Sequence, residues 1–237
     1  MNIPISDRLL ACASFVNPGD RVADVGCDHG YLGIYLLKRN IAKKILASDL
    51  REGPLQSAKD NGALYEVADR MEFFLSDGLK SVPHDFDTLV CAGMGAETMI
   101  SILEAAPWLK NPGYRLILQC QIKNYLLRRY LSENGFRIME EKILRDGRFL
   151  YTVLEASFNP GCRPLTPGQW YIPPVLTEAP DPDFPQYFFW VWGGLHKIVK
   201  SRGEAAPEWM VQADLELREM AQLPVLREFK EKQNESI

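Results

Sequence analysis

The 237-residue sequence lacks the cysteine spacings that mark zinc sites and redox centres. Its five cysteines are odd in number and form no C-x-x-C pair, so we expect reduced thiols, no metal and a cytoplasmic location. No apolar run approaches the roughly 18 consecutive residues that a membrane span needs, and no basic segment followed by an apolar one opens the sequence. A membrane partner is therefore not expected.

An excess of positive charge is also missing. The net charge is −4 at pH 7, which argues against a protein that coats nucleic acid by bulk electrostatics. A local basic patch stays open as an alternative. The sequence does not reveal the oligomeric state, and a monomer is our working expectation.

What is present is an alternation of short β-rich apolar runs with amphipathic stretches, up to about residue 157. This pattern predicts βαβ units and a mainly parallel sheet. The expected strands are 21–25, 44–48, 71–75, 88–91, 114–118, 136–144 and 149–155. The expected helices are 7–15 (with Ser6 as its N-cap), 31–38, 54–62, 97–105 and 123–134.

The last two expected strands are joined by the short segment R-D-G-R, whose Asp-Gly pair predicts a tight hairpin. The fold class predicted is therefore α/β, with a seven-stranded, mostly parallel sheet that ends in an antiparallel hairpin. A class I methyltransferase (Rossmann-like) core has this arrangement, whereas a dinucleotide-binding sheet does not require the hairpin.

The composition changes beyond this core. Eight of the sixteen prolines fall within 160–185, which predicts a linker without regular structure. Two helical stretches follow at 186–201 and 207–232, and we expect Gly193-Gly194 and Pro224 to interrupt them. The chain is thus predicted to have a methyltransferase-type domain at 1–158, a proline-rich linker at 159–185 and a small helical appendage at 186–237.

The strongest functional signal is D-V-G-C-D-H-G-Y-L at 24–32, which ends the first strand and opens the first βα helix. Glycines there let the backbone approach a ligand, and the helix N-terminus offers free N–H donors. The spacing differs from the dinucleotide G-x-G-x-x-G and is closer to the D-x-G-x-G-x-G loop of S-adenosylmethionine enzymes. We predict that Asp24, Gly26, Asp28 and Gly30 bind the cofactor. The structural alternative is a strand, turn and helix with a capping aspartate.

Three further strand ends carry residues suited to the same cofactor. Asp49 ends the second strand, where α/β nucleotide folds present a carboxylate to ribose hydroxyls. Asp77 and Gly78 follow the third strand, where an acidic side chain can accept from the adenine amino group. Gly93 and Met94 follow the fourth, where small residues leave room for the cofactor and an incoming base. Solvated turns and tight helix packing are the structural alternatives, but the order of these strand ends predicts S-adenosylmethionine as cofactor.

Several motifs together connect the sequence with a known family. They are S-D-R-L at 6–9, the segment 24–32, G-P at 53–54, S-D-G-L at 76–79, A-G-M-G at 92–95 and R-L-I-L-Q at 115–119. On these motifs, residues 1–157 resemble the bacterial TrmK-like tRNA (adenine-N1)-methyltransferases. The resemblance implies S-adenosylmethionine as methyl donor, N1 of an adenine in the D-arm region of tRNA (adenine-22 type) as target, and a helical C-terminal domain.

The sequence departs from the family in three places. Ala96 stands where a third glycine is usual, and Cys120-Gln121 stands where the family tends to have Pro-Asn. A proline-rich, aromatic tail replaces the long charged helices. The first two departures lie near the expected target pocket, and the third concerns docking of tRNA.

Candidate catalytic residues follow from the first loop. We predict that Asp28 and His29 lie beside the methyl group, with Asp28 accepting from the amino group of the base or offsetting its positive charge. Tyr31 is predicted to stack on the base or to orient the methionine portion. Arg8 is predicted to cover the cofactor carboxylate or to touch a target phosphate. A helix cap, a local hydrogen bond, core packing and a solvated arginine are the respective structural alternatives.

Candidate substrate contacts follow the fifth strand. Gln119, Lys123, Arg128 and Arg129 are predicted to hold tRNA, and a second basic cluster lies at 197–202. A solvated helix face is the structural alternative for these charges.

The predicted function is methylation of tRNA at adenine N1 by an S-adenosylmethionine-dependent enzyme. Adenine N1 has an in-plane lone pair and no proton at neutral pH, so positioning matters more than a general base. The alternatives are a non-catalytic, RNA-associated protein that binds the cofactor, or a methyltransferase acting on a different RNA or a small molecule. An oxidoreductase is disfavoured by the loop spacing.

Overall fold

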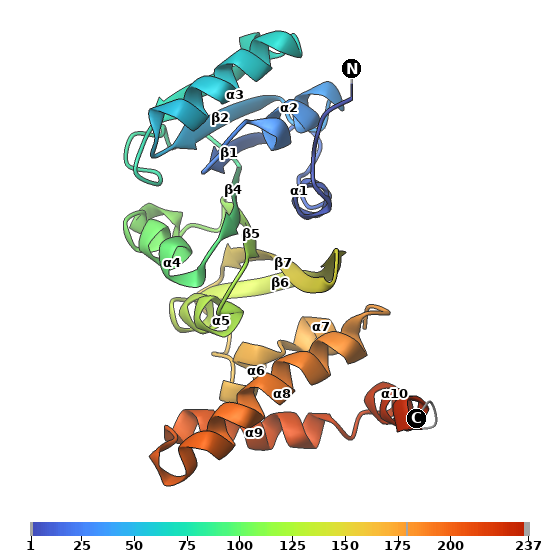
Figure 1. Cartoon of the computed structure of the whole chain (residues 1–237). Coiled ribbons are helices and arrows are strands. Elements are labelled where there is room, and N and C mark those ends of the chain that lie inside the picture. The colour runs from blue at the N-terminus through green and yellow to red at the C-terminus, as the bar shows by residue number, and fades with distance from the viewer. Residues whose placement is uncertain (1, 179, 235–237) are drawn as a thin grey trace. The chain divides into compact units, whose positions relative to one another are not determined.

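The computed structural model describes residues 2–178 and 180–234, which fall into two compact units, Met1–Cys162 and Arg163–Ile237. The predicted division at 158/159 and 185/186 stays a prediction. Figure 1 shows the elements of each unit.

The first unit is built around one seven-stranded sheet in the order β3-β2-β1-β4-β5-β7-β6. Its strands are β1 (Arg21–Val25), β2 (Lys44–Asp49), β3 (Met71–Leu75), β4 (Thr88–Met94), β5 (Arg115–Cys120), β6 (Phe136–Asp146) and β7 (Phe149–Phe158). The pairs among β1 to β5 are parallel, and β7 runs antiparallel to both β5 and β6. The predicted sheet with its hairpin end is confirmed.

Helices cover both faces of this sheet. Neighbouring helices α1 (Asp7–Ala13), α2 (Tyr31–Lys38) and α3 (Glu52–Leu64) pack on one face. In Figure 1, α4 (Ala96–Glu104) and α5 (Asn124–Glu133) lie on the other side of β4 and β5 from α1. As predicted, Ser6 caps α1 by accepting from the N–H of Leu9.

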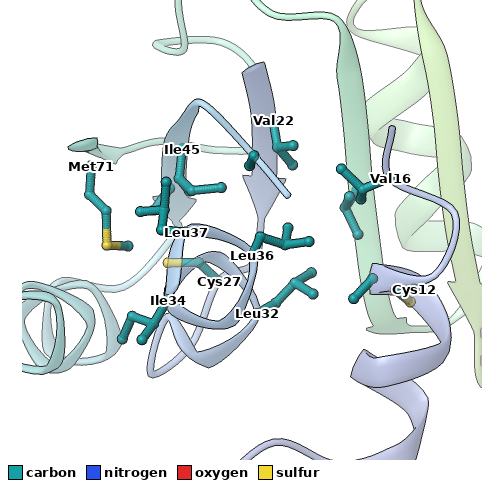
Figure 2. Packing of buried hydrophobic residues seen from close by; sticks show 14 of the residues in the cluster. Cys12, Val16, Val22, Cys27, Leu32, Ile34, Leu36, Leu37, Ile45 and Met71 are labelled. Atoms are coloured by element: carbon teal, nitrogen blue, oxygen red, sulfur yellow. The ribbon is translucent and has the colours of Figure 1, made fainter. Parts of the chain in front are cut away.

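The core under α1 and α2 is apolar. Figure 2 shows side chains of the two helices, such as Cys12, Leu36 and Leu37, together with Val22 and Ile45 of the strands. These strand residues alternate with residues that face the opposite layer, as the two-residue period of a strand requires. Because both faces are covered, ligands can reach the sheet only at its edges.

The second unit begins with two short helices, α6 (Pro167–Tyr171) and α7 (Pro174–Glu178). The prediction of no regular structure in 160–185 is wrong there, because Pro167 and Pro174 open these helices, where a missing N–H costs nothing. Thr166 and Gln169 add a reciprocal capping box to α6.

Three longer helices complete the second unit: α8 (Phe184–Arg202), α9 (Glu208–Met220) and α10 (Pro224–Asn234). Pro224 opens a separate helix as expected, whereas Gly193-Gly194 does not interrupt α8. Buried Phe188 and Leu195 hold the helix on both sides of the glycine pair. Tertiary packing therefore outweighs the low helix propensity of glycine.

Two absences hold for residues 2–178 and 180–234. No helix there is both long and apolar enough to cross a membrane. His, Cys, Asp and Glu side chains of the same ranges form no group of three or more that could hold a metal ion.

Candidate active site

A cavity of about 850 Å3 lies at the carboxyl edge of the parallel strands in the first unit. Residues at the ends of β1 to β5 form most of its lining, and α1 and α4 supply further wall residues. This edge is where open α/β sheets bind ligands. The predicted cofactor residues that line it are Arg8, Asp24, Gly26, Asp28, Asp49, Asp77, Gly78, Gly93 and Met94.

The loop after β1 lies against the backbone of β2. The N–H groups of Gly26 and Cys27 donate to the carbonyl of Ser48 at 2.8 and 2.9 Å. Gly26 has a φ of +73°, and a Cβ atom there would lie 2.3 Å from Cε of Met94. The left-handed backbone conformation favours glycine, and a Cβ atom would in addition displace the flexible end of Met94. Gly30 does not line the cavity; it supplies the left-handed N-cap of α2.

Asp24 presents a buried carboxylate to the cavity. It is 4% exposed, and its Oδ2 has no hydrogen-bond partner among the described residues. Burial, and then the charge of Asp49, raise the pKa of Asp24 to about 7. An unpaired buried oxygen facing a cavity is suited to a cationic donor on a ligand.

Asp49, at the end of β2, is oriented by two backbone donors. Its Oδ1 accepts from the N–H of Arg51 at 2.9 Å, and its Oδ2 accepts from the N–H of Asp28 at 3.3 Å. The second bond ties the β2 end to the first loop, where Asp28 takes a left-handed φ of +50°. Each oxygen keeps a further lone pair for a ligand hydroxyl.

The end of β3 is more exposed to solvent than the ends of β1 and β2. Asp77 is exposed at the cavity and forms an ion pair with Lys80. Gly78 has a φ of +60°, and a Cβ atom on it would lie 3.0 Å from Ile102 of α4. This glycine therefore lets the β3 loop pack closely against α4.

The ends of β4 and β5 are joined by Gln119. Its Oε1 accepts from the N–H of Gly93 at 3.0 Å, and its Nε2 donates to the carbonyl of Cys120 at 3.4 Å. Gln119 is only 1% exposed. Both ends of the amide hold the β4 loop, which bulges at Gly93, although Gln119 also lines the cavity, so its predicted substrate contact stays a prediction.

Of the three predicted catalytic residues, which lie next to one another, only Asp28 lines the cavity. Asp28 lines the cavity with a well-exposed carboxylate, whereas His29 and Tyr31 do not line it. The rings of His29 and Tyr31 stack with centroids 5.7 Å apart, and Tyr31 packs against the core. This geometry therefore does not support the predicted position of His29 beside the methyl group, or the predicted role of Tyr31 in stacking on the base or orienting the methionine portion.

The basic residues on and near α5 differ in exposure. Arg128 is 1% exposed, and its Nη2 lies 2.5 Å from Oε1 of buried Glu141. The prediction that it contacts a phosphate is wrong, because its guanidinium is inside the protein. Arg129 stays partly exposed on α5, and Lys123 forms an ion pair at the cavity rim with Glu97.

Arg8 joins the cavity wall to the β6–β7 hairpin. Its Nε lies 2.8 Å from Oδ2 of Asp146, and its guanidinium carbon lies 5.2 Å from the ring centroid of Tyr151. This predicted residue is therefore present in the cavity, held by charge and by a cation–π contact.

Several cavity residues were missed from sequence. Leu50 carried a signal, because it follows Asp49, whereas Gln121 is expected near the target pocket as a departure from the family but has no predicted role. Thr98 and Ser101 carried none, since nothing local tells which side of α4 faces the cavity.

Comparisons with known proteins agree with this geometry. A methyltransferase-domain family model matches residues 5–154. A Mycoplasma pneumoniae protein named as a putative tRNA methyltransferase is 34% identical over 163 residues, 67% of this chain and 73% of the relative. The crystal structure of a putative tRNA (m1A22) methyltransferase from Streptococcus pneumoniae, in complex with S-adenosyl-L-methionine, is 30% identical with a TM-score of 0.78. It covers 91% of this chain and 98% of that one.

The chain belongs to the TrmK-like family of class I methyltransferases. A Bacillus subtilis relative named tRNA (adenine(22)-N(1))-methyltransferase is 30% identical over 155 residues, and the match spans 65% of each chain, just under two thirds of that protein. The structural match to the S. pneumoniae family member covers more of this chain than its first unit contains. The TrmK-like likeness thus continues into the C-terminal helices, where the sequence departs most.

Proposed function

We propose that this protein transfers a methyl group from S-adenosylmethionine to N1 of an adenine in tRNA. The observation that carries the proposal is the order of groups along the cavity: acidic side chains at the ends of β1, β2 and β3, then a glycine loop and amides at β4 and β5. Further support comes from the S. pneumoniae relative in complex with S-adenosyl-L-methionine and from the name of the B. subtilis relative.

The groups present fit S-adenosylmethionine. Asp49 can accept from two ribose hydroxyls, and Asp77 can accept from the adenine amino group. The unpaired Oδ2 of Asp24 can accept from the ammonium group of the methionine portion. Gly26 allows the ligand to approach the backbone. When bound, this cofactor supplies a methyl group on a positively charged sulfur.

The reaction asks the protein for placement rather than proton removal. Adenine N1 attacks with its own lone pair, the carbon–sulfur bond breaks, and the electron pair stays on sulfur. The positive charge therefore moves to the base. Asp28, whose carboxylate is exposed at the cavity, is our candidate for offsetting that charge.

The macromolecular substrate is part of the proposal. An adenine N1 that is base-paired cannot reach the cavity, so the base must be unpaired or flipped at a cost of a few kcal/mol. Lys123 and Arg129, and the cluster at 197–202, are the candidate phosphate contacts. We propose that the protein acts in the cytoplasm, in keeping with a tRNA substrate, and a monomer remains our expectation.

The experiment is transfer of labelled methyl from S-adenosylmethionine to unmodified bulk tRNA, followed by nucleoside analysis. We expect N1-methyladenosine, and a loss of about 10- to 100-fold in rate for Asp28→Ala at saturating cofactor. Asp69→Ala, an exposed acid outside the cavity, is the matched control. If the cofactor binds but tRNA is not methylated, the proposal is wrong and a non-catalytic, RNA-associated role takes its place.

A further inference from the structure

The β5 end of the cavity holds a polar side chain that the proposed cofactor binding leaves unused. Gln121 directly follows β5, lines the cavity and is exposed. In the strand order β3-β2-β1-β4-β5, the acidic groups proposed for the cofactor lie at β3, β2 and β1. An incoming base therefore has the β4–β5 end of the cavity available to it.

The two glutamines at this end differ in environment. Gln119 is buried with both ends of its amide bonded, as described above. Gln121 is exposed, and its backbone is held by donation from its N–H to the carbonyl of Met94 at 2.8 Å. Its Nε2 lies 3.7 Å from the position that a Cβ atom would take on Gly93. Gln119 thus holds the β4 loop in place, and the amide of Gln121 lies next to Gly93 on that loop.

We propose that Gln121 recognises the target adenine through its Hoogsteen edge. Its Oε1 accepts from the amino group N6, and its Nε2 donates to N7, which is the bidentate pairing that glutamine makes with adenine. N7 and N1 lie on opposite sides of the amino group, so this pairing leaves the N1 lone pair open to the methyl group. The inference rests on the proposed function and names the residue that selects the base.

The same pairing excludes guanine. Guanine presents two acceptors, O6 and N7, on this edge, so Oε1 of Gln121 would face an oxygen with no proton between them. It also leaves the second proton of N6, on the N1 side, available to the carboxylate of Asp28. The base would then be held from both sides without any group covering N1.

The test compares adenine with 7-deazaadenine, in which a C–H replaces N7. The position that the wild-type enzyme methylates in bulk tRNA is identified first. A tRNA is then prepared with either adenine or 7-deazaadenine at that position. For the wild type we expect kcat/KM to fall about 5- to 10-fold on 7-deazaadenine, the loss of one hydrogen bond. Gln121→Ala should lose about 10- to 100-fold on adenine and show no further loss on 7-deazaadenine.

A second variant reverses the preference. Gln121→Glu can accept from N6 but meets the N7 lone pair with a second acceptor, so it should methylate 7-deazaadenine faster than adenine. Because 7-deazaadenine also changes the basicity of N1, only the difference between enzymes is interpreted. Gln56→Ala, an exposed glutamine on α3 outside the cavity, should keep the wild-type response.

The outcomes separate this inference from the function on which it rests. No methylation of adenine by the wild type, with cofactor bound, overturns the proposed function and the inference together. Methylation of adenine with the same ratio of rates on the two bases in the wild type and in Gln121→Ala overturns the inference alone. A 7-deazaadenine loss that persists in Gln121→Ala does the same, because N7 is then recognised by another group.

Discussion

The two halves of the cavity are built from different chemistry. At the ends of β1, β2 and β3 the polar groups are carboxylates, and Asp49 is oriented by backbone N–H groups. At the ends of β4 and β5 they are neutral amides, one buried and bonded and one exposed. Carboxylates suit a cationic ligand rich in hydroxyls, whereas amides read donors and acceptors on a neutral base. Four experiments test this contrast.

The largest effect is expected behind the amide half, at the buried Arg128–Glu141 pair. Arg128→Ala leaves Glu141 buried without its charge partner, so we expect the free energy of unfolding to fall by about 3 to 5 kcal/mol. Urea denaturation measures it. Arg129→Ala, one residue along α5 and partly exposed, should cost less than about 0.5 kcal/mol. Equal losses for the two variants, or a loss of tRNA affinity at unchanged stability for Arg128→Ala, would contradict the structural role of Arg128.

In the carboxylate half, the glycine loop should be the most sensitive point. Gly26→Ala is expected to weaken S-adenosylmethionine binding about 100-fold, because alanine is strained at a φ of +73° and meets Met94. Calorimetric titration measures the affinity, and Gly53→Ala, with open space around it, should change it less than about 2-fold. Adding Met94→Ala should recover only part of the loss, since the backbone strain remains. Full recovery would show that the loop conformation is not required.

The two cofactor aspartates should differ in importance. Asp49→Asn is expected to weaken cofactor affinity about 10- to 100-fold, because a nearly buried, charge-assisted bond to a hydroxyl is lost. Asp77→Asn should cost only about 2- to 3-fold, since Asp77 is exposed and already paired with Lys80. The reverse order of the two losses would place the ribose elsewhere.

The smallest effect is a pH dependence carried by Asp24. Its pKa of about 7 lies above its ordinary value of 3.8, so the apoprotein should lose stability as pH rises from about 4 through 7. A ligand ammonium favours the ionised form, and cofactor affinity should therefore rise through the upper part of this window. The facing groups are Asp49 and the thiols of Cys12, Cys27 and Cys91, whose pKa values are raised by burial, which keeps them neutral.

Asp24→Asn should flatten both pH profiles, measured by thermal unfolding and by calorimetric titration between pH 5.5 and 7.5. Asp69→Asn is the control, because its side chain is exposed outside the cavity. An unchanged slope in Asp24→Asn would assign the titration to another group.

How far the sequence could predict the site differs between the halves. Asp24, Gly26 and Asp49 were predictable, because strand ends and the glycine requirement are local properties of the chain. The sequence could not show which of Arg128 and Arg129 is buried, because Glu141, the partner of buried Arg128, lies on a different element, β6. Nor could the sequence show that His29 and Tyr31, on either side of the left-handed Gly30, lie outside the cavity lining.

The apolar periodicity along the chain predicted the sheet, and the motifs at 24–32, 49 and 77 predicted which ligand groups follow its strands. Which of two nearby residues of the same type is buried follows from tertiary packing alone. Gln119 and Arg128 are inside because Gly93 and Glu141, distant in sequence, meet them across the fold. Gln121 and Arg129 stay accessible, because an exposed or buried environment is set by which elements pack together.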